Sequence, residues 1–353
     1  MLGIGIIGVG DMGTKHARII ADNIPKAKVV SIMDKSEERI SAISKFLDNP
    51  KVFNNAKELI DDNSVEAVLI ASPDVTHADF AEYCIKKGKY LFLEKPLGLS
   101  TKDAEKVLKA EVDHGKRIVQ IGLMRVFDKQ HSEIKKAINE DMIGKPLLFR
   151  GIHKHLVQSG RSAANVITNS AVHDIHSARW LMNDDIISVI ADQIPFTGSD
   201  KNFKDSKLQN SWGTGLSKED STRLVLLQLK FKNGGLGTIE VDIDDNYGYE
   251  VIVEVSGEKG TLRTPSLISP ILRKGNSASQ SIEKDWFLRF DQAYKQELFD
   301  WVNATNNKEV VGASVWDAYI AMQVAEAAIK SLSSFRAEKV PLPVKPKIYK
   351  EET

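Results

Sequence analysis

The stretch MLGIGIIGVGDMG, residues 1–13, decides how the N-terminal part of this chain folds. Its glycines follow the pattern Gly-x-Gly-x-x-Gly, which is typical of a turn that binds a dinucleotide pyrophosphate. The pattern fits twice, once as Gly3, Gly5 and Gly8 and once as Gly8, Gly10 and Gly13. At most one of these two registers can form the turn.

The second register is the one we expect to be functional. A pyrophosphate turn lies between the end of a strand and the start of a helix, whose first N–H groups face the phosphates. Gly8, Gly10 and Gly13 follow an apolar run that ends at Ile7 and lead into a helix that begins near Met12. The first register has neither neighbour, so its glycines are expected to lie within the first strand and allow close helix packing.

Short apolar runs alternate with helical patterns over the first third of the chain. Strands are predicted at 2–7, 27–34, 67–72, 89–94 and 117–122, and helices at about 12–23, 35–48, 76–87 and 101–114. This alternation predicts a doubly wound parallel sheet with helices on both faces. We therefore expect an α/β protein with an N-terminal Rossmann domain over residues 1–123.

The pattern changes after residue 123. Strands are predicted at 146–156, 186–196, 221–231, 236–244 and 249–257, and helices at 170–182, 289–304 and 314–333. The dipeptide Asn233-Gly234 predicts a hairpin, and the polar stretch 198–220 reads as a long loop. Residues 124–353 are thus expected to form a second, α+β domain with a mainly antiparallel sheet.

Composition narrows the class of protein. The 353 residues hold 48 acidic and 48 basic side chains, so no net charge attracts nucleic acid or an anionic membrane. Cys84 is the single cysteine, which excludes an internal disulfide and fits a reducing compartment. No apolar run reaches the roughly 18 residues of a membrane span, so we expect a cytoplasmic protein without nucleic-acid or membrane partners.

Asp34 ends the second predicted strand, about 20 residues beyond the last glycine, where a carboxylate accepts hydrogen bonds from the adenosine ribose. It also repels a 2′-phosphate, so NAD is favoured over NADP, although Lys35 leaves room for NADP. The alternative is that Asp34 caps the helix that starts near Ser36.

Two further stretches carry candidate chemistry. Glu94-Lys95-Pro96 follows a parallel strand, at the sheet edge where ligands bind, and Pro96 restricts Lys95 and could form a cis bond. Asn169 and His173 are one helical turn apart, and a histidine near neutrality suits proton transfer from an alcohol.

The chain resembles the glucose-fructose oxidoreductase / inositol dehydrogenase (Gfo/Idh/MocA) family nearly end to end. The similarity rests on GVGDMGTKHA (8–17), ASPDVTHADFAEYCIKKGKYLFLEKPL (71–97), GLMRVFD (122–128) and the histidine helix. YGYEVIVEVSGEKGTL (247–262) and RFDQAYKQELFDWV (289–302) are most similar to the inositol dehydrogenase branch. The resemblance implies NAD(P), a large open sheet in the second domain, and a homotetramer or homodimer.

The resemblance also implies roles for individual residues. Lys95 and His173 match the catalytic lysine and histidine, and Asn169 stands where inositol dehydrogenases usually have an aspartate. The cofactor-binding set comprises Gly8, Gly10, Asp11, Met12, Gly13, Asp34, Ser72, Pro73, His77, Glu94 and Lys95. The substrate-binding set comprises Lys95, Arg125, His153, His155, Asn169, His173 and Tyr247.

We expect an oxidoreductase that reversibly oxidises a secondary hydroxyl of a cyclic polyol, such as myo- or scyllo-inositol, by hydride transfer to NAD. A pyranose or glycoside dehydrogenase is an alternative. Because an amide carries no charge, Asn169 also raises the hypothesis of a sensor that binds NAD and sugar without turnover.

A metal-dependent hydrolase is the remaining alternative. HKH (153–155) and HDIH (173–176) hold four histidines, and histidine is a common zinc ligand. A zinc site needs a third fixed ligand and supporting contacts that the sequence does not reveal. We therefore expect no metal.

Overall fold

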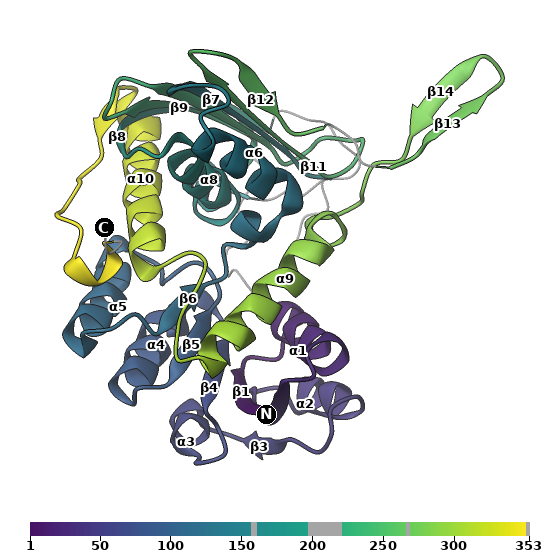
Figure 1. Cartoon of the computed structure of the whole chain (residues 1–353), viewed down its shortest axis with the longest axis vertical. Helices are drawn as coiled ribbons and strands as arrows, with labels where there is room; N and C mark the ends of the chain where they lie inside the picture. The colour runs from purple at the N-terminus through teal and green to yellow at the C-terminus, as the bar shows by residue number, and fades with distance from the viewer. Residues whose placement is uncertain (157–160, 197–220, 266–268, 351–353) are drawn as a thin grey trace. The chain divides into compact units, whose positions relative to one another are not determined.

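A computed structural model describes residues 1–156, 161–196, 221–265 and 269–350 (Figure 1). The chain divides into two compact units. Unit 1 comprises Met1–Phe127, Gln292–Met322 and Pro343–Thr353, and unit 2 comprises Asp128–Asp291 and Gln323–Leu342. The loop expected at 198–220 lies outside the described residues.

Unit 1 contains a six-stranded, fully parallel sheet in the order β3-β2-β1-β4-β5-β6. Its strands are β1 (Leu2–Ile7), β2 (Ala27–Met33), β3 (Lys51–Phe53), β4 (Ala67–Ile70), β5 (Tyr90–Leu93) and β6 (Val119–Ile121). Every residue of β1 and β4 is buried, as expected for strands covered on both faces. This sheet confirms the doubly wound Rossmann prediction.

The helices of unit 1 lie on both sides of that sheet, α1 and α2 on one side and α4 and α5 on the other (Figure 1). They are α1 (Asp11–Asn23), α2 (Glu37–Ser44), α3 (Ala56–Asp61), α4 (His77–Lys86) and α5 (Thr101–His114), with 3₁₀ turns η1 (Asp74–Thr76), η2 (Met124–Phe127) and η5 (Lys347–Tyr349). Local chemistry sets the helix ends: α5 starts with a capping box between Ser100 and Asp103 and stops at the left-handed Gly115.

Three features of unit 1 differ from the sequence expectations. The second helix is shorter than the predicted 35–48, because Ser36 caps α2 and the helix ends at Ser44. The short elements β3 and α3 were not predicted. They have only 3 and 6 residues, too few to show a clear period.

Unit 2 contains a seven-stranded sheet in the order β12-β11-β7-β10-β9-β8-β15. The strands are β7 (Pro146–Lys154), β8 (Ile186–Pro195), β9 (Thr222–Phe231), β10 (Leu236–Asp242), β11 (Glu250–Gly257), β12 (Thr261–Arg263) and β15 (Glu338–Lys339). β7 and β10 pair in parallel, and the other described neighbours pair antiparallel, which confirms a mainly antiparallel sheet. The predicted hairpin joins β9 to β10, with Gly234 at a φ of 92°.

The helices of unit 2 include α6 (Lys129–Asn139), α7 (Ala163–Val166) and α8 (Val172–Met182), and α8 packs against β7. A π-helical turn, η3 (Ile167–Ala171), precedes α8. A separate hairpin of β13 (Ile271–Lys274) and β14 (Ser277–Gln280) projects from this unit (Figure 1). The helices α6 and α7 and this hairpin were not predicted.

Two long helices contribute residues to both units. They are α9 (Trp286–Asn306), which is kinked at Phe290, and α10 (Val315–Ser334), and both predicted terminal helices are thereby confirmed. Among the described residues, no helix is long and apolar enough to cross a membrane.

Candidate active site

The glycine turn between β1 and α1 uses the second register. Gly8 has a φ of 87°, and a Cβ there would lie 2.6 Å from the carbonyl oxygen of Ala71. A Cβ on Gly13 would lie 1.9 Å from the carbonyl oxygen of Gly8, so the helix approaches the turn as closely as a glycine permits. At Gly10 a Cβ would meet only the guanidinium of Arg39, at 3.6 Å, which leaves its surface open to a ligand.

The other two glycines serve packing, as expected. A Cβ on Gly5 would lie 2.5 Å from Cδ2 of Leu59 in α3, and one on Gly3 would lie 2.2 Å from the carbonyl oxygen of Ser64. These glycines let the segment from α3 to β4 lie directly against β1.

The first turn of α1 fits a dinucleotide pyrophosphate. Gly10 is its N-cap, and no side chain of the described residues caps the helix there. The N–H groups of Asp11 and Met12 open the helix, whose dipole favours an anion. The carboxylate of Asp11 itself is exposed, so the main chain of this residue is the part suited to phosphate.

Asp34 lies against the glycine turn. Its carboxylate accepts hydrogen bonds from the N–H of Val9 at 2.8 Å and the N–H of Ser36 at 2.9 Å. The cap of α2 is Ser36, whose hydroxyl accepts from the N–H of Arg39. Asp34 is thus held beside the turn rather than used as the helix cap, and a carboxylate with two oxygens keeps lone pairs for a ribose diol.

The loop after β4 is tied to the loop after β5 through His77, which is 1% exposed. One ring nitrogen lies 2.7 Å from the carbonyl oxygen of Pro96 and the other 2.8 Å from that of Ser72. Ser72 also exchanges a hydrogen bond with Thr76 at 2.7 Å. Pro73 lies between these residues and is exposed, so the predicted cofactor loop has a defined shape next to Lys95.

Lys95 stands in this second loop, and its bond to Pro96 is cis, as the sequence suggested. The carboxylate of Glu94 accepts from the N–H of Lys95 at 3.2 Å and from Nε2 of His16 at 2.6 Å. Burial raises the pKa of Asp74, and the nearby charge of Lys95 opposes that rise. Lys95 therefore lies within electrostatic reach of a carboxyl group on the facing loop.

Arg125, the remaining predicted substrate residue of unit 1, is in η2 just after β6 and is 1% exposed.

In unit 2, His153 of β7 and His155, just after that strand, both contact Tyr249, and His153 also contacts Asp174. Nδ1 of His153 lies 2.9 Å from the carboxylate of Asp174, and Nε2 lies 2.9 Å from the hydroxyl of Tyr249. A carboxylate only accepts, so Nδ1 of His153 carries a hydrogen. The ring of His155 lies 4.4 Å from that of His153 and 5.0 Å from that of Tyr249.

Asn169 and His173, the predicted catalytic residues of unit 2, lie on the consecutive elements η3 and α8. Asn169 lies in the π-helical turn, where its amide donates to the carbonyl oxygen of Asn165 at 3.2 Å. His173 is the second residue of α8, directly before Asp174, and is 8% exposed. Single π turns inside helices are frequent at functional sites. His176, the other histidine of this helix, is 3% exposed.

Tyr247 lies apart from the histidine cluster. It is 46% exposed, and its hydroxyl donates to Glu250 at 2.8 Å. Burial and the neighbouring carboxylate of Glu250 raise the pKa of Tyr247. The tyrosine that contacts the histidines is Tyr249, which is 4% exposed.

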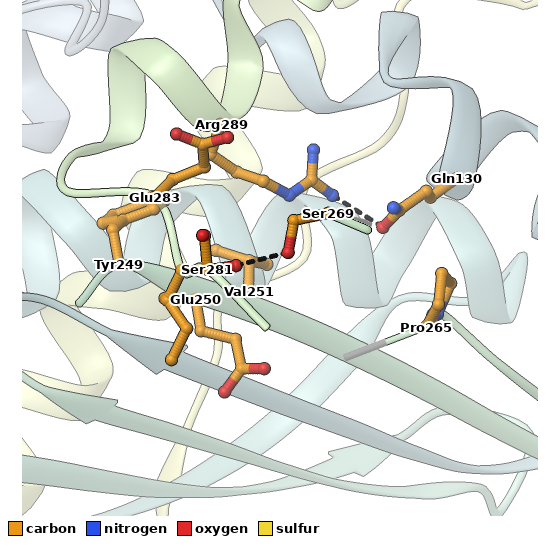
Figure 2. Close-up of a pocket in the computed structure, with 10 residues that line it drawn as sticks. Gln130, Tyr249, Glu250, Val251, Pro265, Ser269, Ser281, Glu283 and Arg289 are labelled. Atoms are coloured by element: carbon orange, nitrogen blue, oxygen red, sulfur yellow. Dashed lines mark hydrogen bonds between the residues drawn. The ribbon is translucent and has the colours of Figure 1, made fainter. Parts of the chain in front are cut away.

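Figure 2 shows a pocket of unit 2 that Tyr249 also lines. Arg289 points across it to Gln130, whose side-chain oxygen accepts at 2.7 Å, and Ser269 donates to the carbonyl oxygen of Ser281 at 2.6 Å. The lining residues are Gln130, Tyr249, Glu250, Val251, Pro265, Ser269, Ser281, Ile282, Glu283 and Arg289. They include none of the predicted substrate residues.

No group of three or more metal-ligating side chains gathers in the part of the chain that the structure describes. Of the four histidines expected for a hydrolase, His153 instead lies at hydrogen-bond distance from Asp174 and Tyr249, and the ring of His155 packs against those of His153 and Tyr249. The geometry gives no support to a zinc site among these residues.

Sequence reasoning did not identify Asp174, Tyr249 and Glu297 as functional candidates. Asp174 adjoins His173 and could have been found from that position. Tyr249 shares its alternation with the buried Val251 and Val253, but Tyr247 shares it too, so period alone does not distinguish the two tyrosines. Glu297 lies on an apolar face of α9 and is fully buried, which is unusual for a carboxyl group.

Comparison with known proteins agrees with this architecture. Residues 2–123 match the NAD-binding Rossmann-fold model of the Gfo/Idh/MocA oxidoreductases, and residues 135–342 match their C-terminal alpha/beta domain. The inositol 2-dehydrogenase of Rubrobacter xylanophilus is 36% identical, over 99% of this chain and 96% of that protein. The inositol 2-dehydrogenase of Salmonella typhimurium is 33% identical, over 98% of each.

Solved structures give the same result. The myo-inositol dehydrogenase of Lactobacillus casei, in complex with NAD(H) and myo-inositol, superposes with a TM-score of 0.89 and is 28% identical, over 99% of this chain and 100% of that one. Two family models that together span most of the sequence, with full-length relatives above 30% identity, identify the chain: it belongs to the Gfo/Idh/MocA oxidoreductase family.

Proposed function

We propose that this protein is an NAD-dependent inositol 2-dehydrogenase, which reversibly oxidises a secondary hydroxyl of a cyclic polyol to the ketone. The observation that carries the proposal is the full-length similarity to inositol 2-dehydrogenases, one of them at 36% identity. The glycine turn, the constrained Lys95 and the buried histidine cluster support it from this chain's own residues.

The cofactor is held by unit 1 in this proposal. Gly10 offers an open surface, the N–H groups of Asp11 and Met12 face the pyrophosphate, and Asp34 accepts from the ribose diol. The Asp34 carboxylate disfavours a 2′-phosphate, so NAD is preferred to NADP. NAD supplies the hydride acceptor, and the protein supplies orientation and proton transfer.

Lys95 and His173 are proposed to act on the same substrate hydroxyl. His173 accepts the hydroxyl proton, and the ammonium of Lys95 stabilises the negative charge that develops on oxygen. Asn169 donates an amide hydrogen bond to a neighbouring hydroxyl, which requires no charge.

The remaining predicted residues position the polyol. Arg125, His153, His155 and Tyr247 are proposed to bind the other hydroxyls. The contact with Asp174 fixes the hydrogen on Nδ1 of His153, so its Nε2 side is the one that meets Tyr249 or a substrate hydroxyl. Substrate binding and assembly are assigned to residues 124–353, and NAD(P) binding to residues 1–123.

We further propose a homotetramer or homodimer located in the cytoplasm. The balanced charge and the single buried cysteine are compatible with that location. Size-exclusion chromatography with light scattering measures the assembly, and a mass of one chain would contradict it.

The test is NADH formation by the purified protein with myo-, scyllo- and chiro-inositol, glucose, xylose and a glycoside, each with NAD and with NADP. Turnover of an inositol with NAD supports the proposal. Turnover of a pyranose alone keeps the mechanism and moves the substrate class. NAD binding without turnover of any compound would contradict the proposal and favour a sensor, for which Asn169 is the observation.

A further inference from the structure

Unit 1 contains a carboxyl group that the proposed mechanism does not use. Glu297 lies on α9, is 0% exposed, and neither of its carboxyl oxygens has a hydrogen-bond partner among the described residues. An ionised carboxylate in such a place is strongly destabilised unless a cation or hydrogen-bond donors compensate. Its chemical state therefore needs an explanation.

The face of α9 that carries Glu297 packs against the elements that precede Lys95. Tyr294, one turn before it, lies 6.0 Å from the ring of His16 in α1, and Trp301, one turn after it, lies 5.6 Å from the ring of Phe92 in β5. Glu297 thus lies between two side chains that contact the surroundings of Glu94.

A third element completes this arrangement. Gln120 of β6 pairs with Phe92 in the sheet, and its amide donates to the main-chain carbonyl of Glu297 at 3.4 Å. The charge of Glu94, which follows β5, acts on Glu297, and the ring of His16 in α1 contacts Tyr294 one turn away on α9, while β6 contributes the neutral Gln120. Burial, followed by the negative charge of Glu94, raises the pKa of Glu297 well above its usual range.

Glu94 has two fixed partners. One oxygen accepts from His16 at 2.6 Å and the other from the N–H of Lys95 at 3.2 Å. Gly122 leaves room for this carboxylate, because a Cβ there would lie 3.0 Å from the Glu94 carboxyl carbon. Two carboxyl groups in one apolar region cannot both ionise without a large penalty.

We propose that Glu297 is a positioning residue for the Lys95 loop, and that it acts as an uncharged carboxylic acid. The proton stays on Glu297, and the single negative charge of the pair stays on Glu94, where it holds His16 and the main chain of Lys95. Ionisation of Glu297 at alkaline pH places a second negative charge beside Glu94 and weakens these two contacts. The catalytic role of Lys95 rests on the proposed function, but the protonation of Glu297 does not.

Infrared difference spectroscopy of the purified chain tests the protonation directly. At neutral pH, the carboxylic-acid C=O band of Glu297 is expected to disappear in Glu297→Gln and to remain in Glu309→Gln, which makes the same change at an exposed carboxyl. In Glu94→Gln, the band is expected to titrate at lower pH, because the neighbouring charge is gone. An identical spectrum for Glu297→Gln and the unmodified chain would overturn the proposal.

NAD affinity, measured by calorimetry from neutral to alkaline pH, tests the positioning role without any substrate. The unmodified chain and Glu309→Gln are expected to lose about tenfold in affinity as Glu297 ionises, the value of one hydrogen bond to a charged group. Glu297→Gln cannot ionise and is expected to keep its affinity over that range. An equal alkaline loss in Glu297→Gln would show that Glu297 has no positioning role, whatever the outcome of the inositol assay.

Discussion

Replacement of single glycines separates the two tasks of the turn after β1. In Gly13→Ala, the new Cβ would lie 1.9 Å from the carbonyl oxygen of Gly8, whereas real Cβ contacts essentially never fall under 3.0 Å. The turn and α1 must therefore separate by about 1 Å, which is overpacking worth about 1–3 kcal/mol. For a unit of this size, each kcal/mol lowers the melting temperature by about 2–4 °C, so the melting temperature is expected to fall by about 2–12 °C.

The same displacement moves the first N–H groups of α1 away from the pyrophosphate. Each hydrogen bond to a charged group contributes about 1.5–3 kcal/mol, so loss of two lowers NAD affinity by about 100-fold or more. Gly10→Ala provides the contrast, because its Cβ meets only the tip of Arg39 at 3.6 Å. That variant is expected to keep its melting temperature and still lose about tenfold in NAD affinity, since the methyl group occupies ligand space.

Calorimetric titration with NAD and thermal denaturation measure both effects. Gly260→Ala is the matched control, because its Cβ would meet Ile143 at an ordinary 3.6 Å in unit 2. Should Gly13→Ala bind NAD within threefold of the unmodified chain, the assignment of the turn would be refuted.

Three further predictions concern other parts of the molecule. Lys95→Ala is expected to abolish turnover and retain NAD binding, and steady-state kinetics with NAD titration would show any surviving rate. Asp174→Asn is expected to lower kcat/KM for inositol by about tenfold, because an amide cannot secure the hydrogen on Nδ1 of His153 as a carboxylate does; unchanged kinetics would contradict this contact's role. Tyr349→Phe removes the hydroxyl that donates to Glu111 and is expected to lower the free energy of unfolding by about 1–2 kcal/mol at neutral pH. Burial raises the pKa of Glu111 above its ordinary 4.5. In acid, Glu111 is therefore protonated in both the folded and the unfolded chain, and the stability lost in Tyr349→Phe is expected to be smaller than at neutral pH. A loss of stability that does not change with pH in denaturation experiments would argue against this.

The Rossmann half of the fold could be predicted because its signals are local. The apolar strands are buried on both faces, and the glycine register is decided by which glycines lie between a strand and a helix. β3 and α3 escaped prediction because such short elements are fixed by their neighbours rather than by their own period. The π turn at Asn169 could not be predicted either, because a helix with one inserted residue has the same composition as a regular helix.

The site was predictable where residues adjoin in sequence and less so where folding joins distant elements. Glu94, Lys95 and Pro96 form one motif, and the structure has them directly after β5, where the sequence predicts them. The contact of His153 with Asp174 and Tyr249 joins β7, α8 and the residue before β11, which no spacing rule connects. Alternation does not separate Tyr247 from Tyr249, because residues two apart share one face of a strand. The two differ because Tyr247 lies in a turn and Tyr249 directly precedes β11.

Hydride transfer from an inositol to NAD is measured most directly by following the hydride itself. The purified protein is mixed with NAD and myo-inositol that carries deuterium on the carbon bearing the hydroxyl at position 2, and the products are analysed by mass spectrometry. Reduced cofactor that contains the deuterium is expected, together with the corresponding ketone. Bound NAD that stays oxidised, or reduced cofactor without deuterium, would contradict this hydride transfer.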